Sequence, residues 1–305
     1  MGAKILQVSF AQALSGRRKR SAIQLSTDVG LNCLHQAGMT VDKLEALINS
    51  GIYRDKHIGE PAIAALIHGD IQKKASQRIS PENLENFFCF DISNGGNGSL
   101  NAIEIASGLI DSGKLNNALI ISGDALPRRN DWLHYPFGSH ASATLLGASE
   151  SVGFKNFFSR SFPEFIHDYS GELQWSKRNR GTRFHHQLLI ERSNQYLTNC
   201  ISCAKETLLE FLLTSGKTLN DFDLMITSHS PNGFTQSLKE EFNLPKNFLI
   251  EPVFRLEIHT AGLGKSLKEA WNSGQFHNAR NILFLSVGAG IQVSVAWYQN
   301  NGQHE

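Results

Sequence analysis

The chain has 305 residues, of which 41% are hydrophobic, and its 29 Lys and Arg against 28 Asp and Glu give a formal net charge of +1. This composition supports a sizeable core and excludes a disordered or low-complexity protein. The near-neutral charge offers no basis for nucleic-acid or anionic-membrane binding, and the short basic run Arg17–Arg20 is expected in a solvated loop. Domains usually have about 100–200 residues, so one large or two small domains are expected.

The cysteines and the apolar runs narrow the class of protein further. Four cysteines are too few for a disulfide scaffold, and no second ligand pair accompanies the C-x-x-C of Cys200 and Cys203. We therefore expect two buried or half-buried thiols on one helix face and no metal. The uncharged run Asn281–Asn300 contains Gly288 and Gly290, which predicts two strands around a glycine turn rather than a membrane helix. No export signal is recognisable, so a cytoplasmic protein without a membrane span is expected.

Short apolar runs alternate with stretches of helical spacing along the chain. Strands are expected at Ile5–Phe10, Phe87–Ile92, Ala118–Ser122, Ala143–Gly147, Leu224–Ser228, Ile282–Val287 and Gln292–Trp297. Helices are expected at Asp28–Ala37, Asn101–Ser112, Gln187–Leu213, Phe234–Phe242 and Leu263–Asn272. This alternation predicts an α/β protein whose helices cover largely buried sheets.

A short internal echo indicates two similar halves. Ser112-Gly113 and Ser273-Gly274 lie 161 residues apart, and each precedes an Asn-Ala pair and an apolar strand. Glycine in this place permits the left-handed conformation that ends a helix. Because the order of elements after both places agrees, we predict an N-terminal half of residues 1–155 and a C-terminal half of residues 156–305.

The stretch Phe90–Glu104 predicts a strand, a glycine-rich turn and a helix in succession. Gly95, Gly96 and Gly98 permit backbone conformations that other residues avoid, and they let a ligand approach closely. The N-terminus of the following helix then offers free N–H groups to an oxyanion or phosphate. The alternative is a tight connection between strand and helix that binds no ligand.

Four stretches, in order, resemble the ketoacyl synthase III enzymes of the thiolase superfamily. They are Phe90-Asp-Ile92 before the glycine turn, the Gly- and Ala-rich Phe137–Glu150, His229-Ser-Pro-Asn232, and Gly288-Ala-Gly290. The resemblance covers most of the chain and implies a five-layered αβαβα fold of two similar βαβαβ halves. It also implies an acyl thioester of coenzyme A or of an acyl carrier protein's phosphopantetheine as substrate, no permanently bound cofactor, and a dimer.

The nucleophile of that family is missing from this sequence. The family's cysteine falls on Gly96, or on Asn97 if the register moves by one residue, and neither side chain can form an acyl-enzyme thioester. His229 keeps the place of the family's catalytic histidine, whereas His259 replaces its catalytic asparagine. The resemblance implies an oxyanion hole from the backbone amides of Gly96 and Gly290.

Three interpretations of this altered site remain open. In the first, the protein decarboxylates or transfers an acyl group without an acyl-enzyme: His229 is the base or enolate stabiliser, His259 a second donor, and Asn97 a further N–H donor. In the second, both histidines are relics and the chain is a non-catalytic partner of a cysteine-containing paralogue in fatty acid or polyketide synthesis. In the third, Ser93 or Ser99 acts with His229 as a serine hydrolase.

Further residues are candidates for contact with the carrier or for the entrance of the site. Arg128 and Arg129 follow a strand and suit a phosphopantetheine or carrier-protein phosphate, with a solvated turn as the alternative. Asn232, at the end of the His229 motif, is a third candidate for binding the coenzyme. His134, His140 and His167 have no metal-ligand spacing and are expected in a loop-rich region near an entrance.

Overall fold

The computed structural model describes residues 2–13, 20–53, 60–75, 87–126, 132–133, 135–177 and 184–301. The first part contains β1 (Gly2–Gln12), α1 (Ala22–Gln36), β2 (Ala46–Asn49), α2 (Ile63–Lys74), β3 (Phe88–Asp91), α3 (Gly98–Asp111), β4 (Asn117–Asp124), β5 (Trp132–Leu133) and β6 (His140–Ser149). The second contains β7 (Gly153–Ser161), β8 (Tyr169–Lys177), β9 (Phe184–Arg192), α4 (Tyr196–Ser215), β10 (Leu224–Thr227), α5 (Phe234–Glu241), α6 (Gly262–Asn272), α7 (Gln275–Asn278), β11 (Asn281–Gly288) and β12 (Gln292–Gln299). Each strand predicted from the apolar runs is present.

The two main sheets repeat one strand order. The first runs β1-β6-β4-β2-β3 and the second, read from its other edge, β7-β12-β11-β10. In both, three antiparallel strands are followed by a parallel neighbour. Gly113 and Gly274 follow α3 and α6 in the left-handed conformation, so the echo in the sequence marks equivalent turns of two similar halves. The predicted division between residues 155 and 156 falls inside β7, whereas a division before Gly153 would keep that strand whole.

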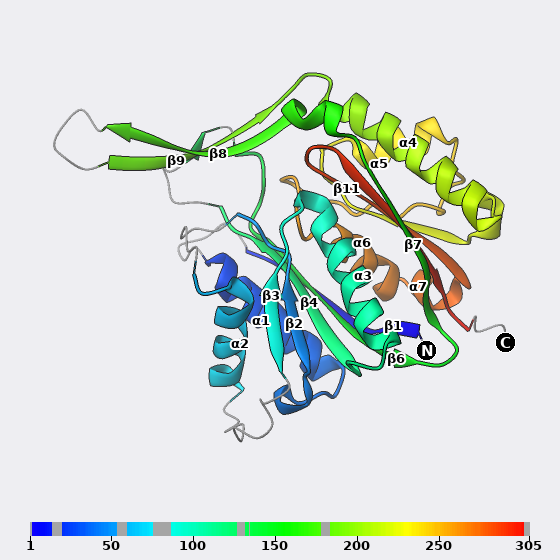
Figure 1. Ribbon diagram of the computed structural model, residues 1–305, viewed down its shortest axis with the longest axis horizontal. Coiled ribbons are helices and arrows are strands. Elements are labelled where there is room, and N and C mark those ends of the chain that lie inside the picture. Colours follow the sequence, from blue (N-terminus) through cyan, green and yellow to red (C-terminus); the bar gives the residue numbers. More distant parts are fainter. Residues whose placement is uncertain are drawn as a thin grey trace.

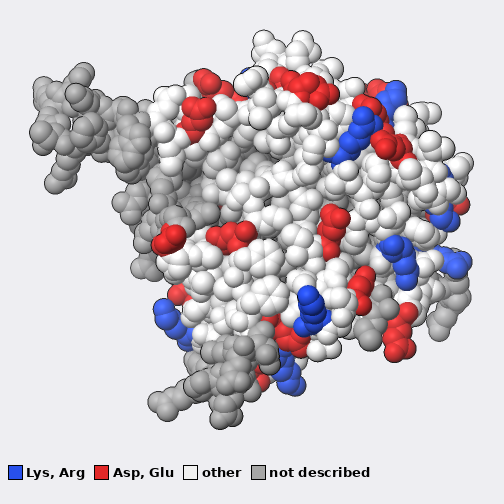
Figure 2. Space-filling view, in the orientation of Figure 1, with Lys and Arg blue, Asp and Glu red and all other residues white. Residues whose placement is uncertain are grey.

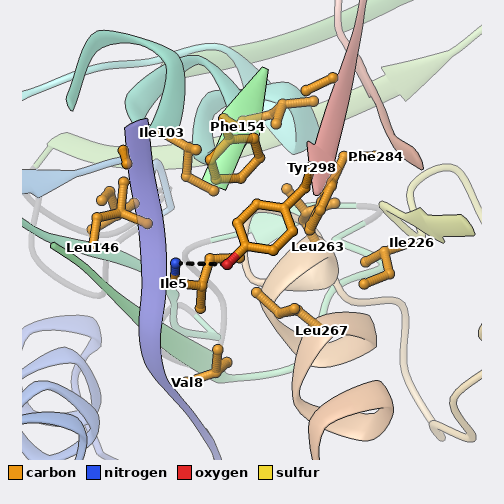
Figure 3. Packing of buried hydrophobic residues seen from close by; sticks show 14 of the residues in the cluster. Ile5, Val8, Ile103, Leu146, Phe154, Ile226, Leu263, Leu267, Phe284 and Tyr298 are labelled. Carbon is orange, nitrogen blue, oxygen red and sulfur yellow. Dashed lines mark hydrogen bonds between the residues drawn. The ribbon is translucent and has the colours of Figure 1, made fainter. Parts of the chain in front are cut away.

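Helices and sheets form five layers (Figure 1). α1 and α2 cover the outer face of the first sheet, α3 and α6 lie between the sheets, and α4 and α5 cover the second sheet. In the central layer the ring of Tyr298 lies among apolar side chains, and its hydroxyl accepts a hydrogen bond from the Ile5 backbone N–H at 3.2 Å (Figure 3). Strands covered on both faces explain why apolar runs rather than alternating patterns identified them.

A third sheet has the strand order β5-β9-β8. Its β8–β9 hairpin projects from this body (Figure 1). The predicted helix Gln187–Leu213 is wrong over its first residues, because β9 continues to Arg192 and α4 begins at Tyr196. Leu188 and Ile190 are buried whereas Glu191 is exposed, which is the two-residue period of a strand. In the sequence, the apolar residues Leu188 to Ile190 are compatible with a helix and with a strand.

Other predictions have mixed outcomes. Cys200 and Cys203 are both buried on α4, as predicted. His140 is not in an entrance loop: it lies in β6, is buried and stacks on Phe10, because β6 continues the sheet from its first residue. His167 is exposed in a 3-10 turn before β8. No helix in the described ranges is long and apolar enough to span a membrane, and these ranges contain no group of three or more His, Cys, Asp or Glu suited to a metal ion.

Candidate active site at the turn before α3

The turn between β3 and α3 packs against the turn between β11 and β12. Gly95 has φ +52°, and a Cβ placed on it would lie 3.2 Å from the Ala289 nitrogen and 3.5 Å from His259 Nε2. A Cβ on Gly96 would lie 2.8 Å from the Val287 carbonyl oxygen. Because that oxygen belongs to the backbone of β11, the packing leaves no room for a cysteine side chain at position 96 without a shift of the main chain.

Asn97 and Gly290 have different local environments. The Asn97 side chain is fully buried and donates to Ser294 Oγ at 2.9 Å and to Gln292 Oε1 at 3.3 Å, so it is directed toward β12. Its Oδ1 has no hydrogen-bond partner among the described residues. Gly290 has φ +87° in the β11–β12 turn, with open space where a side chain would be. Asn97 is therefore part of a polar contact between α3 and β12.

His229 is held on both ring nitrogens by hydroxyl groups. Nε2 lies 2.6 Å from Ser266 Oγ, and Nδ1 lies 3.0 Å from Thr235 Oγ1. Ser266 Oγ donates its only hydrogen to the Thr227 carbonyl at 2.7 Å, so we assign the His229 proton to Nε2. Burial, with a smaller contribution from the Lys265 charge, lowers the pKa of His229 to about 3 and keeps the ring neutral. Neither nitrogen is left for a substrate.

His259 has a different partner. Its Nδ1 lies 3.4 Å from Asp124 Oδ2, next to the carboxylate but without a well-aligned hydrogen bond, and both residues are buried. Nε2 is directed toward Gly95, and no hydrogen bond to it exists within the described residues. His259 therefore has one ring nitrogen beside the glycine turn with no hydrogen bond among the described residues, whereas both ring nitrogens of His229 are engaged.

Four hydrogen bonds fix the Asp124 carboxylate. Oδ1 accepts the backbone N–H groups of Ile52 (3.1 Å) and Tyr53 (2.7 Å), and Oδ2 accepts the N–H (3.0 Å) and hydroxyl (2.6 Å) of Thr260. Burial by itself raises the pKa of this carboxyl. The close approach of the His259 ring, together with the hydrogen bonds from Thr260 and Tyr53, outweighs burial and lowers the pKa of Asp124 below its ordinary value. Asp124 is thus an ionised, oriented partner for His259.

The remaining candidates are not joined to this pair. Ser99 is buried and donates to the Thr260 carbonyl at 2.8 Å, while Ser93 is exposed, and the two ring nitrogens of His229 bond other hydroxyls. Asn232 is exposed in the loop before α5. Arg128, Arg129 and His134 lie outside the described residues.

Comparisons of sequence agree with this architecture. A model of the family described as 3-Oxoacyl-[acyl-carrier-protein (ACP)] synthase III matches residues 90–161. The beta-ketoacyl-[acyl-carrier-protein] synthase III of Aquifex aeolicus is 21% identical over 284 residues, covering 90% of this chain and 82% of its own length. That of Chlorobium luteolum is 22% identical over 294 residues, covering 92% and 85%. Over most of its length the chain is thus similar to beta-ketoacyl-[acyl-carrier-protein] synthase III enzymes.

Solved structures show the same fold over nearly the whole length. OleA of Xanthomonas campestris, crystallised as a variant with lauric acid and lauroyl-CoA, aligns with a TM-score of 0.78 at 16% identity, covering 98% of this chain and 99% of that one. The 3-oxoacyl-(acyl carrier protein) synthase III of Xanthomonas oryzae aligns with a TM-score of 0.76 at 16% identity and the same coverage. The predicted thiolase-like five-layered fold is confirmed.

An ion pair and a cavity adjoin the His259 segment. Arg192, at the end of β9, forms two hydrogen bonds of 2.7 and 2.8 Å with Glu257, which also accepts the Ser230 hydroxyl at 2.6 Å. The Arg192 guanidinium lies 5.1 Å from the ring centroid of Phe137. A cavity of about 600 Å³ beside it is lined by Pro136, His167, Ser170, Ile190, Glu191, Arg192 and Ser193.

Among the described residues, the charged side chains around that cavity are mainly acidic. Glu164, Glu172 and Glu191 are exposed near the base of the hairpin. Figure 2 shows that the coloured side chains near the hairpin on this face are mainly acidic, whereas Lys and Arg appear mainly on the side away from it. Among the described lining residues the only basic side chain other than His167 is Arg192, which is paired with Glu257.

Sequence reasoning located His229 and His259 but missed Asp124, Tyr53 and Tyr169. Asp124 directly follows an apolar strand run and Gly123. An acidic residue at the end of a buried strand could have indicated a functional residue. Tyr53 and Tyr169 carry no motif, since their proximity to His259 arises only when the hairpin folds over the first sheet.

Proposed function

We propose that this synthase III relative transfers an acyl group from a thioester directly to an acceptor, with His259 as the general base. The arrangement of Asp124 and His259 carries the proposal. A carboxylate facing Nδ1 favours the tautomer with its proton on that nitrogen, which leaves Nε2 as a proton acceptor. The direction of Nε2 toward the Gly95 turn supports a reaction at that turn.

The proposed reaction forms no acyl-enzyme. An acceptor hydroxyl, amine or water attacks the thioester carbonyl carbon, and His259 Nε2 takes the acceptor's proton as the new bond forms. The C–S bond then breaks, and the leaving sulfur receives that proton from Nε2. Asp124 remains ionised and stabilises the imidazolium between the two steps. General base catalysis of this kind contributes roughly 10²–10⁴-fold in rate.

The position of the ring hydrogen in each of the two histidines favours transfer over decarboxylation. Decarboxylation of a malonyl-type thioester requires N–H donors aimed at the developing enolate. The Nε2 proton of His229 is bonded to Ser266, and Nε2 of His259 is an acceptor in the tautomer that Asp124 favours. The free nitrogen of this site therefore suits proton removal from an acceptor.

A non-catalytic partner subunit is the second candidate, and specific observations favour it as well. Val287 blocks a cysteine at Gly96, and both nitrogens of His229 are engaged, which suits a fold retained for assembly. Among the described residues β3 is an edge strand of the first sheet, and its Phe88 is 37% exposed beside the half-buried Phe90. A sheet edge with an exposed aromatic side chain suits pairing with a second copy or with a cysteine-containing paralogue.

The substrate carrier in this proposal is coenzyme A or the phosphopantetheine of an acyl carrier protein. The thioester is consumed as substrate, and the proposed steps use only Asp124 and His259 of this chain. Fatty acid or polyketide synthesis is the corresponding setting. Asn232, exposed near the His229 loop, is available to contact the carrier.

One experiment separates the two candidates. Purified protein is incubated with lauroyl-CoA, and both released thiol and the intact mass of the protein are followed. We expect thiol release above the buffer rate, no acyl adduct, and loss of the release in His259→Ala. A folded protein whose release equals the buffer rate would reject the acyltransferase proposal in favour of the partner subunit. A stable adduct would reject direct transfer.

A further inference from the structure

Two phenol groups meet beside the His259 ring. Tyr53 follows β2 and Tyr169 begins β8, and their hydroxyl oxygens are 2.5 Å apart. The ring centroid of Tyr53 lies 5.1 Å from that of His259, and the Tyr169 ring lies 6.5 Å away and nearly parallel to it. The base of the β8–β9 hairpin thus contributes a hydroxyl to the same cluster as the Asp124–His259 pair.

The two phenol groups have one hydrogen more than the hydrogen bond between them uses. Each phenol carries one hydrogen, and the bond between the two oxygens uses one of the two. Neither hydroxyl has another hydrogen bond within the described residues, so one O–H is left without an acceptor. Tyr53 is only 7% exposed. The Tyr169 side chain is only partly buried, and an oxygen atom of a bound ligand would supply the missing acceptor.

The two phenols remain donors at neutral pH. Burial raises the pKa of Tyr53 far above its ordinary value. Burial also raises the pKa of Tyr169 to about 12, although its hydrogen bond with Tyr53 and the charge of Arg192 act in the opposite direction. Both hydroxyl groups therefore keep their hydrogens in the pH range where a histidine acts as a base.

The Tyr53 hydroxyl is fixed by its backbone and by its neighbours. The Tyr53 N–H donates to Asp124 at 2.7 Å, and its carbonyl accepts from the Ala125 N–H at 2.9 Å. On β8, a Cβ on Gly171 would lie 2.7 Å from the Tyr53 hydroxyl, so the missing side chain provides the space that this hydroxyl occupies. Asp124 thus orients His259 through its side chain and Tyr53 through its main chain.

We propose that the Tyr53–Tyr169 pair is a further catalytic element of this site, whose free O–H donates to the carbonyl oxygen of the acyl thioester. The inference rests on the proposed acyl transfer. When the acceptor attacks and His259 takes its proton, the carbonyl π electrons move to oxygen and the phenol hydrogen bond stabilises that oxyanion. When the C–S bond breaks, these electrons return to the carbonyl. The phenol keeps its proton throughout, and sulfur takes the proton held by His259.

The direct test is the carbonyl stretching frequency of bound lauroyl-CoA labelled with ¹³C at the thioester carbon. Infrared difference spectra are recorded immediately after mixing with the wild-type protein, with Tyr53→Phe/Tyr169→Phe and with Tyr135→Phe. Tyr135 is the matched control, because its ring packs edge-on against Tyr53 at 5.6 Å while its hydroxyl donates to the Ala125 carbonyl at 3.2 Å. We expect a lowered frequency in the wild type and in the control, and a return toward the aqueous value in the double variant.

Turnover supplies the second measurement. Loss of one oxyanion donor typically lowers kcat by about 10²–10³-fold, so the double variant is expected to lose about 100-fold in kcat with little change in KM. Bound lauroyl-CoA with the same frequency in wild type and double variant would overturn the phenol assignment, while thiol release that depends on His259 would still uphold the proposed function. Absence of lauroyl-CoA binding to the folded protein would overturn both.

Discussion

His229 and His259 are both buried at the same end of the molecule, yet their surroundings differ in kind. His229 lies between the hydroxyls of Thr235 and Ser266, which occupy both ring nitrogens. His259 faces the carboxylate of Asp124 on one side and the Gly95 turn on the other. Burial alone therefore does not mark a reactive histidine. A hydroxyl pair holds a neutral ring in place, whereas an ionised carboxylate prepares a ring to accept a proton.

The largest effect on the rate of thiol release is expected from removing the charge of Asp124. Asp124→Asn removes the charge that favours the Nδ1–H tautomer and stabilises the imidazolium, so lauroyl-CoA thiol release should fall by about 100-fold or more. The measurement is the steady-state rate of thiol release at neutral pH. Thr260→Val is the control, because it removes one hydrogen bond to Asp124 but leaves the carboxylate in place. Equal rates in wild type and Asp124→Asn would contradict the proposed base.

The contrast between the histidines also shows what sequence alone can provide. The strands were predictable because sheets covered on both faces require continuous apolar runs, and β4 is buried along its whole length. The Ser-Gly echo predicted equivalent helix ends because left-handed turns favour glycine at Gly113 and Gly274. The start of α4 was not predictable from spacing, since Leu188 to Ile190 fit a strand and a helix equally well.

The candidate site was less accessible to sequence reasoning for a physical reason. The resemblance located His229 and His259, but the chemistry of each ring depends on partners from other parts of the chain. Asp124 ends β4, far from His259 in sequence, and only the packing of the two halves brings them together. Similarly, the effect of Val287 on position 96 depends on a backbone oxygen, which leaves no trace in residue type.

His229 should matter for stability more than for chemistry. His229→Ala removes two hydrogen bonds and leaves a cavity beside Ser266, so the free energy of unfolding should fall by about 2–4 kcal/mol. Urea denaturation measures this change, and Asn232→Ala, at an exposed position of the same loop, should stay within about 0.5 kcal/mol of wild type. A loss of thiol release in folded His229→Ala as large as that in Asp124→Asn would contradict the division of roles.

Restoring a thiol tests whether the glycine turn has become incompatible with covalent chemistry. In Gly96→Cys the new Cβ would meet the Val287 carbonyl oxygen at 2.8 Å, and the required shift should cost about 1–3 kcal/mol of stability. We expect no acyl adduct in the intact mass after incubation with lauroyl-CoA, because the nucleophile position and His229 are both unsuited to the reaction. A lauroyl adduct on the introduced thiol of Gly96→Cys, with unchanged stability, would show that the turn still accepts a cysteine.

The pH dependence of stability gives the most specific comparison. The folded-state pKa of His229, lowered to about 3 by burial, lies below the ordinary value of 6.5, so between these values the unfolded chain binds a proton that the native ring does not. The stabilising contribution is therefore complete above about pH 6.5 and is lost as pH falls toward 3. One proton corresponds to a slope of about 1.4 kcal/mol per pH unit. His229→Gln keeps an amide that can bond Ser266 but does not titrate, so its unfolding free energy should lose less on acidification from about pH 6.5 to about pH 4. Parallel curves for wild type and variant would mean that the native ring is protonated as readily as the unfolded one, and His229 would then be open to solvent or to a charged partner.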